Sequence, residues 1–170
     1  MNIRGRLIVK TTPDYLSIPQ DNVILENYGI NELSFDSVKK YREKFSSIKP
    51  NHPWNGLEIK DFLYKIGAWG KVRDTNKEGL TLAGLLMFSE ERVITEILPQ
   101  YFLEYREYTK DLLNEEWSQR FTSQDGTWSG NVFDFYFKVS EKLVADLQDD
   151  IAMPGERTTI LSCLYESLIN

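Results

Sequence analysis

The sequence is poor in the side chains that most often carry catalysis or bind metals. Its 170 residues include one cysteine, Cys163, and one histidine, His52. A single cysteine excludes an internal disulfide and any zinc site built from several cysteines, and it is typical of a reducing compartment. A single imidazole is weak support for a catalytic triad or a metal centre. We therefore interpret His52 as a residue of the rigid turn 50–54 and Cys163 as a small core residue.

Long apolar runs are also missing. The longest, Leu80 to Phe88, falls far short of the ~20 residues that cross a bilayer. The N-terminal arginines are not followed by the apolar run of a secretory signal, and neither a Walker-type phosphate loop nor a GxGxxG pattern occurs. With 41% hydrophobic and 13% aromatic residues, the chain is expected to fold. We predict a cytoplasmic protein that has no membrane partner.

Charge is distributed unevenly along the chain. Residues 1–85 carry 13 Lys or Arg and 10 Asp or Glu, whereas residues 86–170 carry 7 and 16. Nucleic acids are bound through basic surfaces, so the acidic second half is a poor candidate for that role. The densest basic stretch, 39–49, contains Lys39, Lys40, Arg42, Lys44 and Lys49. We interpret this stretch as the solvated side of a helix.

Spacing and capping signals predict several helices. Ser34 is a suitable N-cap for a helix that ends before Pro50, and Asn55 with Glu58 resembles a capping box for a second helix that ends near Gly67. The run 80–88 fits a buried strand or a helix, and Thr81 as a cap favours the helix. A long helix is expected after Gly130, and a last one over residues 158–170.

Strand signals are fewer. Residues 7–9 are β-prone, and residues 101–105 are expected to pair with residues 117–122 through a connection at 110–116. Residues 71–79 are polar and turn-prone. The predicted fold class is therefore α+β, a mainly helical body with a small antiparallel β-sheet or hairpin.

One loop, Asp125-Gly126-Thr127-Trp128-Ser129-Gly130-Asn131, is more distinctive than the rest. Two glycines bracket an aromatic residue and permit tight turns before the long helix. We interpret it as a structural corner plugged by Trp128, and ligand contact is the alternative. Trp54 and Trp69 are interpreted as packing anchors, and the adjacent carboxylates at 90–91 and 149–150 as solubilising charges.

The last residues hold a pair of oxygen-bearing side chains. Glu166 and Asn170 are four residues apart on the predicted helix, so they share one face. A carboxylate in such a pair can orient a water, and an amide oxygen can bind Mg²⁺ beside phosphates. The same pair also arises by chance on any amphipathic helix.

Three strings together resemble a known family. They are Asn51-His52-Pro53-Trp54, Gly79-Leu80-Thr81-Leu82-Ala83-Gly84-Leu85-Leu86-Met87-Phe88 and Gly126-Thr127-Trp128-Ser129-Gly130-Asn131-Val132-Phe133-Asp134-Phe135-Tyr136. Their order is similar to the middle region of bacterial proteins described as transcriptional regulators or RecG-related ATP-dependent DNA helicases. In that family a Schlafen AlbA-type DNA-binding domain precedes this region, and a GHKL-type (histidine-kinase-like) ATPase-like domain follows it.

The resemblance implies roles for the last helix. The family's ATPase-like portion opens on a Glu-x-x-x-Asn signature, which Glu166 to Asn170 matches. By resemblance, Glu166 would activate water and Asn170 would bind Mg²⁺ with ATP in the parent protein. The glycine-rich lid that completes such a site is not in the sequence, so we expect no cofactor and no resident metal here. Residues 1–28 do not match the AlbA-type domain.

We therefore expect three parts: an N-terminal arm or linker (1–30), an α+β connecting domain (31–157), and the first helix of a truncated ATPase-like domain (158–170). The chain is interpreted as an excised fragment of a longer polypeptide. Its leading function is a non-catalytic connecting or interaction domain of a DNA-binding transcriptional regulator. Its partners would be the neighbouring domains of the same chain, DNA through the parent protein, and a second copy if the last helix is left uncovered.

Two alternative functions belong to classes other than a connecting domain. In the first, the chain touches nucleic acid directly through Lys39, Lys40, Arg42 and Lys44, near Trp54. In the second, which we rank last, the chain is an ATPase in its own right. DNA titration at two salt concentrations separates the connecting domain from the direct binder, because phosphate contacts make affinity depend steeply on salt.

Overall fold

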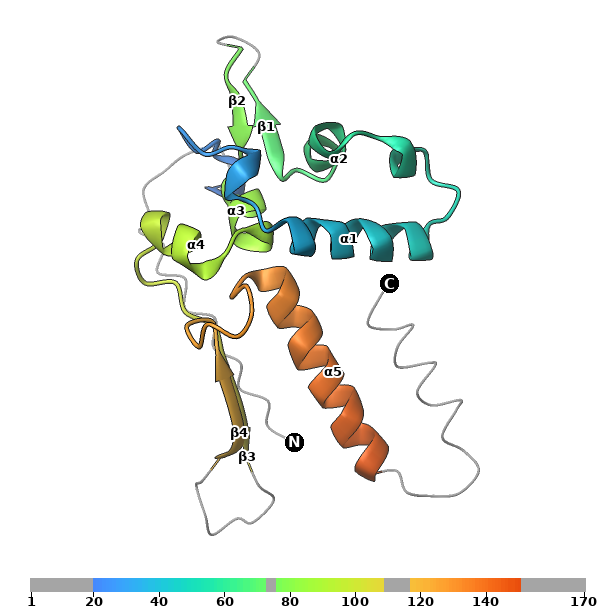
Figure 1. The fold of residues 1–170 in the computed structure, drawn as a ribbon, viewed down its shortest axis with the longest axis vertical. Helices are drawn as coiled ribbons and strands as arrows, with labels where there is room; N and C mark the ends of the chain where they lie inside the picture. Colours follow the sequence, from blue (N-terminus) through green and yellow to red (C-terminus); the bar gives the residue numbers. More distant parts are fainter. Residues whose placement is uncertain (1–19, 73–75, 109–116, 151–170) are drawn as a thin grey trace. The chain divides into compact units, whose positions relative to one another are not determined.

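The computed structural model describes residues 20–72, 76–108 and 117–150 (Figure 1). In these residues the fold is α+β, as predicted: five α-helices accompany two antiparallel two-stranded sheets. None of these helices combines the length and the apolar character needed to cross a membrane. The chain divides into two units, residues 1–135 and residues 136–170, and each is described by itself.

Helix α1 (Phe35–Ile48) begins after Ser34, as predicted. Its buried side begins at Ser37 and Val38, whose exposed fractions are 0% and 4%. Farther along, the Tyr41 ring meets Phe88 at 5.3 Å and Phe133 at 5.5 Å between ring centroids, both edge-on. Tyr41 therefore joins α1 to two other helices in one aromatic cluster.

The second helix starts later than the capping-box pattern predicts. Pro53–Gly56 form a short 3₁₀ turn, and helix α2 (Ile59–Lys65) follows with Glu58 as its N-cap. The Asn55 side chain does not cap α2. It donates to the carbonyl oxygens of Lys49 and Pro50, at 2.8 and 3.0 Å, and so stabilises the preceding loop.

The predicted end of this helix is confirmed. Gly67 has a φ of +82° and directly follows the last turn of α2. Its N–H donates to the Tyr64 carbonyl, and the Ala68 N–H donates to the Leu63 carbonyl. This paired arrangement is a Schellman cap, which needs the left-handed conformation that glycine adopts without strain.

The two ends of the polar stretch 71–79 belong to a hairpin that the sequence pattern does not predict. Strand β1 (Trp69–Lys71) pairs with strand β2 (Glu78–Leu80), and Gly70 lies opposite Gly79. The strands are only three residues long, which is too short for a recognisable alternation of apolar and polar residues. Lys60 of α2 forms an ion pair with Glu78 and thereby ties the hairpin to the helix.

Residues 23–25 lie along the other edge of β2. The Leu25 N–H donates to the Leu80 carbonyl at 2.8 Å, and the Leu82 N–H donates to the Val23 carbonyl at 2.9 Å. Ile24 fills the space above the glycine pair: a Cβ added to Gly70 would lie 2.6 Å from the Ile24 side chain. The part of the expected N-terminal arm that the structure describes thus packs on the body.

The run 80–88 is divided between two elements. Leu80 ends β2, and helix α3 (Leu82–Phe88) follows, with the Thr81 hydroxyl accepting a hydrogen bond from the Gly84 N–H at 3.0 Å. The prediction of a helix capped by Thr81 is thus confirmed. Helix α4 (Glu91–Ile97), which directly follows, was not predicted, because Glu90 and Glu91 were interpreted as surface charges.

The second hairpin confirms one predicted strand and shifts the other. Strand β4 (Trp117–Thr122) has the predicted bounds, whereas strand β3 (Glu104–Tyr108) begins three residues later than expected. Two hydrogen bonds with Ser123 hold Leu103 before the strand: the Ser123 N–H donates to the Leu103 carbonyl at 2.9 Å, and the Leu103 N–H donates to the Ser123 hydroxyl at 3.1 Å. This buried contact ends the regular pairing.

One face of the second hairpin carries a group of charges. Glu104 contacts Arg106 at 2.9 Å and Arg120 at 2.6 Å. Burial opposes ionisation, but the hydrogen bonds from these two arginines prevail and hold the pKa of Glu104 below its usual value. Because the two arginines lie opposite each other across the strands, Glu104 also separates two like charges.

Helix α5 (Val132–Asp150) is the long helix predicted after Gly130. It begins in the first unit and continues into the second. The predicted strand 7–9, the connection 110–116 and the helix 158–170 lie outside the described residues.

The close packing of α3 on residue 68 generates a prediction. A Cβ added to Gly84 would lie 2.2 Å from the Ala68 carbonyl oxygen, a backbone atom that cannot move aside cheaply. We expect Gly84→Ala to lower the free energy of unfolding by about 2 kcal/mol or more, as overpacking does. Urea denaturation would measure it.

Gly56→Ala is the matched control, because an added Cβ there meets no atom within 4 Å. It should change the free energy of unfolding by less than about 0.5 kcal/mol. Equal effects of the two substitutions would contradict the packing described here.

Candidate functional site

The distinctive loop before α5 forms a tight corner. The Asp125 carboxylate accepts hydrogen bonds from the N–H and hydroxyl of Thr127, at 2.9 and 2.7 Å. Burial opposes ionisation of this carboxyl, yet the hydrogen bonds hold its pKa below the usual value. Trp128 donates from Nε1 to the Thr122 carbonyl, and its ring stacks on Phe135 at 5.9 Å. The interpretation of Trp128 as a packed plug is confirmed.

Gly130 fixes where the corner meets α4. Its φ is +73°, and an added Cβ would lie 2.6 Å from the Glu91 side chain and 2.7 Å from the Ser123 carbonyl oxygen. Its own carbonyl accepts a hydrogen bond from the Tyr101 hydroxyl at 2.8 Å. Burial, together with nearby Glu91, raises the pKa of Tyr101 well above its usual value, so this donor keeps its proton.

The end of this corner and the first turn of α5 form a partly buried hydrogen-bonded group with α1. We call Ser37, Ser129, Asn131 and Asp134 the α1–α5 polar cluster. The Asn131 Nδ2 donates to the Ser37 hydroxyl at 2.9 Å, and that hydroxyl donates to the Asp134 carboxylate at 2.7 Å. The Ser129 hydroxyl donates to the same carboxylate oxygen at 2.6 Å. Ser37 and Asn131 are both 0% exposed.

The cluster also caps α5. Asn131 precedes the helix, and its Oδ1 accepts a hydrogen bond from the Asp134 N–H at 2.8 Å, which satisfies a backbone donor of the first turn. The Asp134 carboxylate lies in this turn, where the helix dipole favours negative charge. Lys40 of α1 approaches it at 3.7 Å, with 60% of its side chain exposed, so this pair contributes little.

The arrangement suits structural anchoring better than catalysis. A serine nucleophile must be accessible to a substrate, whereas Ser37 is 0% exposed and its hydroxyl is engaged with the Asn131 amide and the Asp134 carboxylate. The sole histidine, His52, accepts a hydrogen bond at Nδ1 from the Trp54 N–H at 3.2 Å and caps the 3₁₀ turn there. Its ring also packs edge-on against Phe45 and Trp54, which agrees with the interpretation as a turn residue.

The side chains of the basic stretch make different kinds of contact. Lys39 lies 3.9 Å from Glu43, with which it forms an exposed ion pair. Arg42 donates from its guanidinium to the Leu57 carbonyl at 2.7 Å and to the Asn55 carbonyl at 3.3 Å. It also lies 5.1 Å from the centre of the Phe62 ring. Arg42 therefore fixes the loop before α2.

The remaining basic residues lie toward the end of α1. Lys44 is half-buried, and the Lys49 ammonium lies 5.8 Å from the centre of the Phe45 ring. Trp54 stacks parallel to that same ring at 6.0 Å. Trp54 is thus a packing anchor, and the buried Trp69 is another, as predicted.

Two predicted site residues, Glu166 and Asn170, lie outside the described residues. Over residues 20–72, 76–108 and 117–150, no group of three or more His, Cys, Asp or Glu side chains is placed to hold a metal ion.

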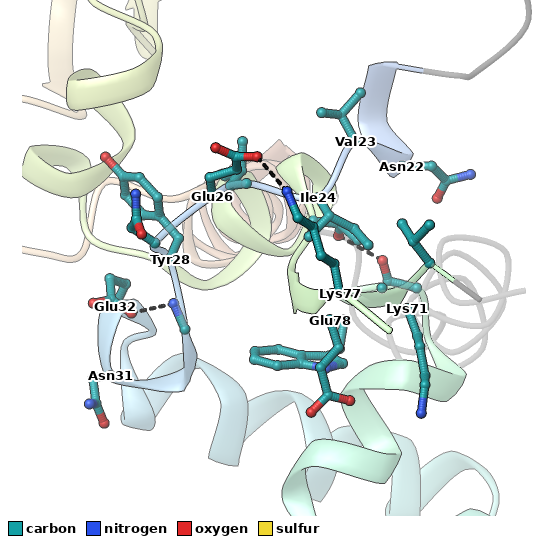
Figure 2. A pocket seen from close by; sticks show the side chains of 18 residues that line it. Asn22, Val23, Ile24, Glu26, Tyr28, Asn31, Glu32, Lys71, Lys77 and Glu78 are labelled. Carbon is teal, nitrogen blue, oxygen red and sulfur yellow. Dashed lines mark hydrogen bonds and ion pairs between the residues drawn. The ribbon is translucent and has the colours of Figure 1, made fainter. Parts of the chain in front are cut away.

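An open groove of about 1050 Å³ lies beside the first hairpin (Figure 2). Residues 22–32 form one side and the hairpin β1–β2 forms the other. Figure 2 shows Glu26 and Lys77 reaching toward each other, and their ion pair measures 3.0 Å. At the other end, Glu32 accepts a hydrogen bond from the Gly29 N–H at 2.6 Å. Glu26 and Lys77 thus pair with each other, and the Glu32 carboxylate satisfies a backbone donor.

Comparison with known proteins identifies a family. A family model described as a domain of unknown function, DUF8451, matches residues 12–104, more than half of the chain. The chain therefore belongs to the DUF8451 family. No curated protein matches the chain, and no solved structure does.

The polar cluster was not recognised from the sequence, although a signal for part of it exists. Asn131 followed three residues later by Asp134 is a capping-box-like pattern at the start of an apolar helix. Ser37 gives no such signal, because it meets Asn131 across 94 residues of sequence. Long-range hydrogen bonds of this kind depend on the tertiary fold.

The partly buried cluster generates a prediction about stability. We expect Asn131→Ala to lower the free energy of unfolding by about 3 kcal/mol, because it removes the helix cap and leaves buried partners unsatisfied. Ser37→Ala should cost about 2 kcal/mol for the second reason alone. Urea denaturation of both variants and of the double variant would measure these costs and their coupling.

Ser47→Ala, at an exposed position of the same helix, is the control and should be nearly neutral. The double variant should lose at least about 1 kcal/mol less than the sum of the two single losses. Strict additivity would show that the two side chains do not act together.

Proposed function

We propose that the chain is a non-catalytic connecting domain of a DNA-binding transcriptional regulator of the kind that its sequence resembles. The observation that carries the proposal is the α1–α5 polar cluster, which fixes the first turn of the chain's longest described helix onto α1. A connecting domain needs such a fixed attachment, because a flexible one transmits no change of orientation. The resemblance implies that a nucleotide-binding domain follows the connecting domain in the parent protein. A fixed start of α5 is compatible with that order of domains.

The pattern of contacts along the basic stretch supports this proposal over direct nucleic-acid binding. Arg42 is bound to loop carbonyls, and Lys39 and Lys40 each face a carboxylate. The alternative keeps one observation in its favour: Lys39 and Lys40 are 64% and 60% exposed. Direct DNA binding through Lys39, Lys40 and Lys44 is therefore the second candidate.

DNA titration separates the two candidates. A fluorescently labelled duplex would be titrated with the chain at about 50 and 200 mM salt, the range over which phosphate contacts weaken strongly. For a connecting domain we expect no saturable binding at either concentration, because the chain carries a net charge of -6 and Arg42 is bound to loop carbonyls.

Two triple variants make the outcome specific. Lys39→Ala/Lys40→Ala/Lys44→Ala removes the candidate surface, and Lys65→Ala/Lys71→Ala/Arg92→Ala removes the same number of charges at exposed positions elsewhere. Salt-dependent binding that only the first variant abolishes would establish the second candidate and contradict the connecting role.

Nucleotide binding is tested separately. By resemblance, Glu166 and Asn170 form only part of an ATP site, so we expect no heat of binding when ATP with Mg²⁺ is titrated into the chain. Isothermal titration calorimetry would measure this. An ATP affinity that Asn170→Ala removes would mean that the chain holds a working nucleotide site, and would contradict the non-catalytic assignment.

A further inference from the structure

The segment before α1 forms an outer strand of the first sheet, and we call its residues 20–28 the strap. Ile24 lies opposite Thr81 in an antiparallel bridge. Backbone hydrogen bonds run on both sides of this bridge: from the Leu25 N–H to the Leu80 carbonyl at 2.8 Å, from the Leu80 N–H to the Tyr28 carbonyl at 3.3 Å, and from the Leu82 N–H to the Val23 carbonyl at 2.9 Å. Strand β2 therefore lies between β1 and the strap.

The strap also places one side chain in a notch of the sheet. Gly70 and Gly79 lie opposite each other, and we call the space above this pair the glycine notch. Ile24 fills it: a Cβ added to Gly70 would lie 2.6 Å from the Ile24 side chain, and one added to Gly79 would lie 3.1 Å from it. The β2 edge thus recognises an extended backbone together with one branched apolar side chain, as in peptide recognition by strand addition.

The strap is held less firmly than the sheet that it covers. None of its residues is buried. Two of its side-chain ties are exposed, namely the ion pair between Glu26 and Lys77 and the hydrogen bond from the Tyr28 hydroxyl to Glu96. The open groove lies between residues 22–32 and the hairpin (Figure 2). Segments with few buried contacts and exposed hydrogen bonds open locally while the rest of a protein stays folded.

A hinge follows the strap. Gly29 joins it to the short 3₁₀ turn Ile30–Glu32, and the Ser34 N–H then donates to the Phe88 carbonyl at 2.7 Å. The chain is thus fixed to the body from Ser34 onward, so a rotation about the residues before it carries the strap away from β2 without disturbing α1. A few loop residues of this kind are enough to absorb such a change.

We propose that the β2 edge and the glycine notch form an interaction surface for the strap of a second copy of this chain. When the strap opens, the N–H and carbonyl of Leu80 lose their partners and the notch is emptied. The strap of another chain carries the same residues and restores the same bonds, so reciprocal exchange builds a closed dimer. The structure shows that the strap fits this edge, which favours a second copy over an unrelated peptide.

Protein concentration decides which strap occupies the edge. The strap of the same chain competes at an effective concentration of about 1 mM, because its tether is short. The exchanged dimer therefore forms where the chain is concentrated, and the monomer forms elsewhere. This surface goes beyond the proposed connecting function and requires neither DNA nor ATP, so the two proposals fail independently.

Mixtures of single-cysteine variants test the exchange directly. In a Cys163→Ser background, Val23→Cys is mixed with Leu82→Cys at about 1 mM protein and oxidised. These positions face each other across the strap and β2, and a disulfide requires Cα atoms within about 7 Å. We expect at least about tenfold more disulfide between chains than in a control mixture of Val23→Cys with Ser47→Cys, an exposed position near the far end of α1.

A further mixture relates the cross-link to the notch. Ile24→Asp, added to the Val23→Cys chain, should lower the yield to that of the control mixture, because burial of a carboxylate beside the glycine pair is costly. Equal yields with Leu82→Cys and Ser47→Cys would overturn the proposal. A yield that Ile24→Asp leaves unchanged would also overturn it.

Hydrogen exchange of the unmodified chain tests the opening on which the dimer depends. Release of the strap exposes the amides of Leu25 and Leu82, whereas the Thr81 amide keeps its hydrogen bond to the Ala68 carbonyl at 3.0 Å. At low protein concentration we expect the first two amides to exchange at least about tenfold faster than the Thr81 amide, after correction for their intrinsic rates. Equal protection of all three would show that the strap opens only with the whole sheet, and would overturn the proposal.

Discussion

The hydrogen bonds among Ser37, Asn131 and Asp134 are the constraint on which much of the first unit depends. Ser37 and Asn131 are fully buried, so each must be present for the other to avoid an unsatisfied polar group. These hydrogen bonds fix the first turn of α5 onto α1, and Tyr41 of α1 adds aromatic contacts with Phe88 and Phe133. A purely apolar contact would tolerate sliding, whereas these directional bonds favour one register.

Two of the strings that resemble a known family acquire a physical explanation from the packing. In Gly79 to Phe88, Thr81 caps α3, and Gly84 lets that helix approach the Ala68 carbonyl. In Gly126 to Tyr136, Gly130 admits the close contact with Glu91, and Asn131 caps α5. These requirements are structural: they concern helix caps and close backbone approaches, and not a chemical site.

Local signals predicted the parts of the fold that local interactions determine. Thr81 and Gly67 marked helix boundaries correctly, because their caps involve neighbouring residues. Ser34 also marked the start of α1, although its side chain makes no capping hydrogen bond. The prediction that Asn55 caps the second helix was wrong, because its side chain donates hydrogen bonds to carbonyls of the preceding loop. The hairpin β1–β2 was not predicted because its strands are three residues long. The hydrogen bond between Asn131 and Ser37 was not predicted because Ser37 belongs to a helix far away in the sequence. The candidate DNA-binding residues looked alike in sequence, but Arg42 proved to be bound within the protein.

The packing of residues 23–25 along β2 also affects how the protein behaves in concentrated solution. Unpaired strand edges can pair with other chains and seed aggregation, and β2 has this edge occupied by its own chain. Ile24 holds that covering segment in place above Gly70 and Gly79, where larger residues would displace it. The segment before α1 therefore acts as a built-in protection against edge-to-edge association, and proteolytic loss of it would expose the β2 edge to other chains.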